Sequence, residues 1–289
     1  KSEKIIGKWM KQRKCRERLV LATKIVGPTS ASRGMSGYIR DGINHLTNEN
    51  INKALEGSLG RLGTDTIDLY QIHWPDRDVN IFGQREFTYP QDEDIENVEI
   101  SETLETLEKL RQAGKIRAFG ISNETPWGVM RYLSLAEKND WERVVSIQNS
   151  YNLLNRSFES GLAEITFRES VGLLAYSPLA FGTLTGKYLD GLKPARARLT
   201  LYSRFKRYQT KNALKATREY VRLAREFSLD PAQMALAFVR TRSFTTSVIL
   251  GATTVKQLES NLACAELELS SEVLDAIDEI HNRIPNPCP

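Results

Sequence analysis

The residues best suited to chemistry are a lysine and a histidine that end two apolar, strand-like runs. Lys24 follows the run 19–23 and His73 follows the run 67–72. A lysine in such a place is usually a surface or edge residue, and a lone histidine is more often bonded to the backbone than catalytic. The functional alternative is that both face one cavity, where the histidine could serve in catalysis.

Polar or aromatic residues also end the other strand-like runs. They are Ser122-Asn123, Gln148-Asn149-Ser150, Tyr176-Ser177-Pro178 and Gly251-Ala-Thr-Thr254. Each of them has an ordinary explanation as a turn or core residue. In an α/β barrel, however, the carboxyl ends of the strands form one rim, and active sites lie on that rim. The shared position therefore predicts one functional site.

These residues must be positioned by strands that alternate with helices, a pattern typical of a parallel sheet. The predicted strands cover 19–25, 67–73, 117–122, 144–151, 172–177 and 246–251. The predicted helices cover 51–62, 104–110, 126–138, 159–170, 212–227, 231–241, 255–262 and 272–284. Gly63 is expected to end the first of these helices. Asp230 is expected to begin the helix 231–241, and Ser270 or Ser271 is expected to begin the helix 272–284.

About six strand–helix units can be counted, whereas a (β/α)8 barrel needs eight. Either the fold is an open six-stranded sheet, or two units precede the sequence. The chain begins with Lys1 in a segment that places Ile5, Ile6 and Trp9 on one helical face. We take this as a start inside a helix, which favours a barrel whose first two units are missing.

Composition bounds the class of protein. The 289 residues are 40% hydrophobic and 26% charged, with a formal net charge of +4, as in an ordinary soluble protein. The sequence contains no array of basic and aromatic residues of the kind that binds nucleic acid. It also contains no apolar run that is long enough for a membrane helix. The cysteines Cys15, Cys264 and Cys288 are sparse and lack metal-ligand spacing, which favours free thiols and a cytoplasmic location.

Several segments together resemble the aldo-keto reductases, most closely the bacterial Tas-like branch. They are residues 67–75, 114–123, 148–152, 176–188, 230–240 and 250–253, with Gln257 and Asn261. The resemblance covers essentially the whole chain and implies a single (β/α)8 barrel domain over 1–289, incomplete at its N-terminus. A GxGxxG motif follows none of the strands, which disfavours a doubly wound dinucleotide fold.

The resemblance implies reduction of aldehydes or ketones by direct hydride transfer from NADPH. Lys24 and His73 correspond to the lysine and histidine of the family's Asp-Tyr-Lys-His tetrad. The aspartate and the proton-donating tyrosine normally lie upstream, and no tyrosine here, Tyr38 included, lies in the matching motif. We therefore expect negligible turnover from these residues alone. The alternative is a cofactor-binding regulatory subunit like the potassium-channel β subunits.

The resemblance also assigns a cofactor site and a substrate contact. The residues implied in NADP(H) binding are Ser122, Asn123, Gln148, Tyr176, Ser177, Pro178, Leu179, Gly182, Lys187, Gly251, Ala252, Thr253, Gln257 and Asn261. Arg198 and Arg204 are weaker candidates for phosphate contact. Trp74 is expected to contact a small carbonyl substrate, at the start of a loop, 74–98, that walls the site. No metal is expected, and the oligomeric state is left open.

Overall fold

The computed structural model describes residues 1–28, 39, 42, 44–84, 86–87 and 97–289. These residues form two compact units. The first contains the described residues up to Val79 and from 97 to Ile147, and the second contains those from Asn80 to Phe87 and from Gln148 to Pro289. The single barrel domain over 1–289 stays a prediction.

The described strands are parallel and follow one another in chain order, β1-β2-β3-β4-β5-β6. Their bounds are β1 Ala22–Ile25, β2 Ile67–Ile72, β3 Ile116–Ser122, β4 Ser146–Gln148, β5 Gly172–Ala175 and β6 Thr245–Val248. All six predicted strands are confirmed, and so is the α/β class. Strand β1 begins later than expected because the backbone N–H of Leu21 donates to the Asp68 carboxylate, 2.8 Å away.

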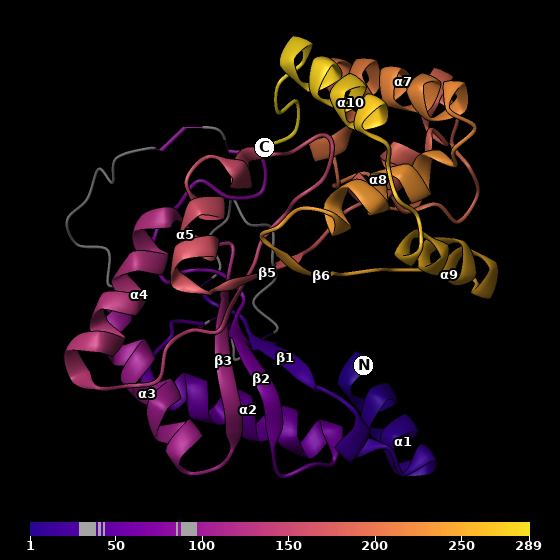
Figure 1. The fold of residues 1–289 in the computed structure, drawn as a ribbon. Helices are drawn as coiled ribbons and strands as arrows, with labels where there is room; N and C mark the ends of the chain where they lie inside the picture. The colour runs from indigo at the N-terminus through magenta and orange to yellow at the C-terminus, as the bar shows by residue number, and fades with distance from the viewer. Residues whose placement is uncertain (29–38, 40–41, 43, 85, 88–96) are drawn as a thin grey trace. The chain divides into compact units, whose positions relative to one another are not determined.

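In the first unit, strands β1, β2 and β3 lie side by side and are accompanied by helices (Figure 1). The helices are α1 Ser2–Arg13, α2 Asn48–Leu62, α3 Ile100–Gln112 and α4 Pro126–Asn139. Helix α2 contacts β1, and α3 contacts β3 and α4. The core combines strand side chains such as Tyr70 and Phe119 with helix side chains such as Leu55 and Leu104, all of them buried.

In the second unit, β5 pairs with β6 and helices pack around α8. The helices are α5 Leu162–Glu169, α6 Arg198–Leu201, α7 Lys211–Glu226, α8 Pro231–Arg240, α9 Val255–Leu262 and α10 Ser271–Arg283. Residues 234–239 of α8 are each 0% exposed, because α7, α9 and β6 all contact this helix. Helix α8 is therefore the core of the unit.

Short 3-10 turns fill the connections between these elements. They are η1 Arg16–Arg18, η4 Ser157–Glu159, η5 Ala180–Thr185, η6 Leu189–Gly191, η7 Arg207–Gln209 and η8 Ala263–Ala265. Three of them, η5 to η7, break the region between β5 and α7, which the sequence predicted only as a loop. The three cysteines are free and buried. No helix in the described part of the chain is long and apolar enough to cross a membrane.

Most helix ends follow the predicted signals. Gly63 adopts φ 67° and closes α2, while Asp230 and Ser270 accept backbone N–H bonds at the starts of α8 and α10. The predicted N-terminal helix is present as α1. Its expected apolar face is largely exposed, however, and Met10 is its buried residue.

The cap at α8 allows a test of this description. Asp230→Ala should lower the free energy of unfolding by about 1 kcal/mol, because the N–H groups of Ala232 and Gln233 lose their acceptor. Urea unfolding followed by circular dichroism measures the change. Asp230→Ser, which keeps a capping oxygen, is the matched control, and equal losses in both variants would contradict this account of the cap.

Candidate active site

Strand register places the lysine and the histidine on one face of the sheet. Lys24 pairs with Gln71, and Gln71 pairs with Gly120 on the next strand. Because side chains alternate between faces, His73 and Ser122, each two residues further on, share the face of Lys24. The backbone N–H of His73 donates to Ile25 O at 2.9 Å, so the ladder continues to this rim.

The electrostatics of this pair are set by burial. The pKa of the His73 imidazole falls from 6.5 to about 4, first because burial disfavours its charged form and second because of the positive charge of Lys24. Burial also lowers the pKa of Lys24. His73 is therefore neutral at neutral pH, and one of its ring nitrogens carries a proton that it can donate in a hydrogen bond.

Asn123 connects the ends of β2 and β3. Its amide nitrogen Nδ2 donates to the backbone oxygen of His73 at 2.8 Å and to Ser122 Oγ at 3.2 Å. Its backbone has φ 54°, a left-handed conformation that asparagine tolerates better than most residues. The amide nitrogen is thus engaged within the protein, where it joins the residue that ends β3 to the residue that follows β2.

Trp74 supports this rim from within the first unit. Its side chain is 1% exposed, and its indole Nε1–H donates to Pro28 O at 2.8 Å. The His73 ring lies against it, with centroids 4.4 Å apart. This burial favours a supporting role, while the expected substrate contact stays a prediction. Residues 85 and 88–96 of the expected substrate loop, and Tyr38, lie outside the described part of the chain.

The predicted aromatic plate of the second unit, Tyr176, follows β5. Its N–H donates to Asn149 O at 3.0 Å and its carbonyl accepts from the N–H of Tyr151. Burial raises the pKa of the Tyr176 hydroxyl to about 12, against the effect of Arg207, which hydrogen-bonds it. The phenol therefore stays protonated at neutral pH. In the same unit, Gln148 is buried at the end of β4.

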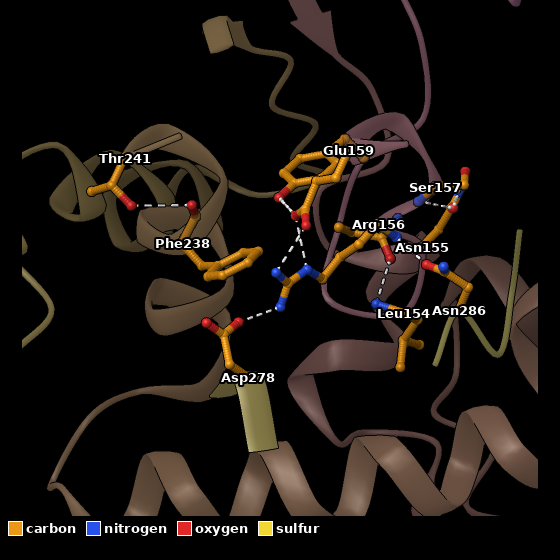
Figure 2. A network of polar contacts seen from close by, with 11 residues as sticks. Leu154, Asn155, Arg156, Ser157, Glu159, Phe238, Thr241, Asp278 and Asn286 are labelled. Atoms are coloured by element: carbon orange, nitrogen blue, oxygen red, sulfur yellow. Dashed lines mark hydrogen bonds and ion pairs between the residues drawn. The ribbon is translucent and has the colours of Figure 1, made fainter. Parts of the chain in front are cut away.

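A buried arginine anchors the segment that pairs with Tyr176 (Figure 2). Arg156 donates from Nε and Nη2 to the two oxygens of Glu159, at 2.8 and 2.9 Å, and from Nη1 to Asp278 of α10 at 2.5 Å. The hydroxyl of Tyr151 donates to the same Glu159 carboxylate. This network ties the segment after β4 to helix α10.

The turn after β5 has an unusual backbone. Ser177, Phe181 and Gly182 all have positive φ, and Asn152 Nδ2 donates to Ser177 O at 3.0 Å. A Cβ atom at Gly182 would lie 2.7 Å from Nζ of Lys187, so glycine is needed for that side chain to cross the turn. Burial lowers the pKa of Lys187. Pro178 is buried and Leu179 partly so.

The last predicted segment, Gly251–Thr253, is exposed and leads into the N-terminus of α9. Gln257 Oε1 accepts from the N–H and the hydroxyl of Thr253, both at 2.9 Å. Asn261 is buried and its Nδ2 lies 3.5 Å from Gly251 O. Both amides thus shape the turn that includes Ala252, and Gln257 keeps its nitrogen as a donor.

Sequence reasoning missed three charged residues that shape these halves of the site: Arg77, Glu124 and Arg207. Arg207 lies three residues from Arg204, which was considered, but spacing alone does not indicate which guanidinium reaches Tyr176. Glu124 directly follows the predicted Ser122-Asn123 pair, and this position at the end of a strand was the available signal. The described residues contain no cluster of three or more histidine, cysteine or acidic residues that could hold a metal.

Comparisons with known proteins place this arrangement in context. The sequence model described as aldo/keto reductase family matches residues 1–282. Protein Tas of Escherichia coli K12 is 50% identical over 288 residues, covering 100% of this chain and 82% of that protein. An aldo-keto reductase of Babesia bovis is 37% identical, covering 93% and 98%. The NADH-specific methylglyoxal reductase of E. coli K12 is 30% identical, covering 93% and 76%.

The perturbed histidine gives a direct test of the first half of the site. Histidine-labelled protein, followed by NMR during a pH titration, should show a His73 midpoint near 4. The chain has three histidines, so substitutions at His45 and His281 assign the signals. Lys24→Met should raise the midpoint but leave it below 6.5, because burial, the larger cause, remains. A midpoint of 6.5 or above in the unmodified chain would contradict this description.

The same shift affects stability in a defined direction. The unfolded chain binds a proton on this histidine below about pH 6.5, whereas the folded chain does so only near pH 4. The contribution of His73 to the free energy of unfolding is therefore full above pH 6.5 and is lost as the pH falls through this window. Urea unfolding at several pH values should show a smaller acid-induced loss in His73→Phe, which cannot titrate. An equal loss in both proteins would show that His73 does not contribute.

Proposed function

Since this chain belongs to the aldo/keto reductase family, we propose that it acts in the NADP(H)-dependent reduction of an aldehyde or ketone to an alcohol. The observation that carries the proposal is the neutral His73 imidazole beside Lys24 on one face of β1 and β2. The bound nicotinamide would supply the hydride. We also propose the (β/α)8 barrel as the complete fold of the family member and the cytoplasm as its location.

In the proposed reaction His73 binds the carbonyl oxygen of the substrate. Negative charge develops on this oxygen as the carbonyl carbon is reduced, and a preorganised N–H donor stabilises that charge most when water is excluded. A neutral imidazole can perform this task because one of its ring nitrogens keeps an N–H that can be donated. The ammonium of Lys24 favours the neutral form of His73 and adds positive charge to the same face.

The carboxamide of the nicotinamide would be held by Ser122, Asn123 and Gln148. Asn123, whose Nδ2 donates to His73 O, is proposed to pair with the carboxamide. That pairing would fix which face of the ring meets the substrate. Tyr176, protonated and held through its backbone, offers an aromatic plane for stacking.

The phosphates and the adenine would be bound by the remaining predicted residues. The turn 177–179 with Gly182 brings backbone close to Lys187, whose ammonium is the proposed phosphate partner. The turn 251–253 precedes the N-terminus of α9, where backbone N–H groups favour an anion. Gln257, through its nitrogen, and Asn261 are the proposed adenine contacts.

Protonation of the alcohol oxygen is assigned to a tyrosine by the resemblance, and no tyrosine in these residues lies in the matching motif. The proposal therefore gives the residues of this chain the roles of cofactor binding and carbonyl polarisation. The preference for NADPH over NADH follows the resemblance. It needs its own test, because one relative is named as NADH-specific.

The proposal predicts NADPH binding and a slow, His73-dependent oxidation of the bound cofactor. NADPH fluorescence gives the affinity, with NADH measured alongside, and excess aromatic aldehyde is then added to follow one turnover. His73→Ala should slow that turnover by about a hundredfold, because one donor to the developing oxyanion is lost, and leave the affinity for NADPH nearly unchanged.

His281→Ala is the matched control, since it removes a histidine of α10 in the second unit. Equal turnover rates in His73→Ala and His281→Ala would sink the catalytic assignment. Tight NADPH binding without any turnover would favour the regulatory alternative instead. Absence of NADPH binding would overturn the whole proposal.

A further inference from the structure

A charged pair joins the two loops that carry His73 and Asn123. The guanidinium of Arg77 donates from Nη1 to Glu124 Oε2 at 3.1 Å and from Nη2 to Oε1 at 2.5 Å. Arg77 lies four residues after His73, and Glu124 directly follows Asn123. Nη2 also donates to Thr125 Oγ1 at 3.2 Å, the hydroxyl that caps α4. The pair therefore spans the ends of β2 and β3.

The pair is largely buried, which costs free energy, and the chain leaves space for it at Gly128. The Glu124 side chain is 2% exposed, and a buried carboxylate is unfavourable unless it is paired and hydrogen-bonded. A Cβ atom at Gly128 would overlap Glu124 Oε1 and would lie 2.5 Å from Arg77 Nη2, so the pair could keep this geometry only with glycine in the first turn of α4. The ring of Trp127 covers the guanidinium, 4.9 Å away.

The loop after β2 is held on a second side as well. Asp76 Oδ2 accepts from the N–H of Leu46 at 2.5 Å, and its Oδ1 bonds His45 Nδ1 at 2.8 Å. Asp76 fixes the loop toward the start of α2, whereas Arg77 fixes it toward the start of α4. The hydrogen bond from Asn123 to His73 O holds the same loop at its beginning, where it leaves β2.

We propose that the Arg77–Glu124 pair is a positioning clamp that holds the His73 loop and the Asn123 loop at a fixed separation. It thereby keeps the Asn123 side chain hydrogen-bonded to His73 O. The two-pronged geometry matters here, since two parallel bonds fix orientation where a single charge contact would not. This inference rests on the proposed function, because it concerns how the carbonyl-binding histidine and the carboxamide-binding asparagine are aligned.

A second pair in the same unit supplies a matched comparison. Arg111 donates to both oxygens of Glu108 at 2.8 and 2.9 Å, and the Glu108 side chain is 4% exposed. It lies in the last turns of α3, which leads to the amino end of β3, away from the rim with Ser122 and Asn123. A merely structural role would give the two pairs the same consequences.

The test compares Arg77→Lys and Glu124→Gln with Arg111→Lys and Glu108→Gln. Melting temperature reports stability, fluorescence reports NADPH affinity, and NMR reports the side-chain amide protons of Asn123. All four variants should melt lower. Only the clamp variants should expose the Asn123 amide protons to exchange and weaken NADPH binding by roughly five- to tenfold, the loss of about one hydrogen bond.

Arg77→Lys separates charge from geometry, because it keeps the positive charge but not the two parallel bonds. The clamp is overturned if the Asn123 amide signals in both clamp variants match those in Glu108→Gln. It is also overturned if NADPH affinity falls equally in both pairs of variants. If the unmodified chain does not bind NADPH, the proposed function fails, and the Asn123 amide signals still decide whether the clamp exists.

Discussion

The hydrogen bond from the Asn123 side chain to the backbone oxygen of His73 is the contact on which the first half of the site depends. It joins the ends of two neighbouring strands, and it requires Asn123 to hold a left-handed backbone conformation. It also engages the nitrogen of that amide within the protein. The bond thus helps to fix the backbone of the histidine relative to the end of β3.

Burial gives this rim its chemical character. An imidazole in water would be partly charged near neutral pH, but the buried His73 next to Lys24 is held neutral. Burial also acts on Tyr176 in the second unit, since it raises the pKa of the phenol to about 12 against the effect of Arg207. In each unit burial thus favours the uncharged form of one predicted site residue.

Much of the fold could be predicted from the sequence because its signals are local. The cap residues Gly63 and Asp230 act within one helical turn. The apolar composition of the strand-like runs indicates directly that these strands are buried. The side-chain partners could not be predicted, because Arg77 and Glu124 are 47 residues apart and meet only in the fold. Trp74 shows the same limit, because the partner of its indole N–H is the backbone oxygen of Pro28, 46 residues away in the chain.

Because glycine at position 128 has no side chain, the residues at positions 77, 124 and 128 constrain one another in evolution. The Cβ of any larger residue there would overlap the Glu124 carboxylate and the Arg77 guanidinium in their present positions. A descendant that replaces this glycine must therefore move or change the acid or the base, or move the first turn of α4. Positions 77, 124 and 128 are therefore expected to drift together among related sequences, with glycine at 128 wherever the other two keep their charges.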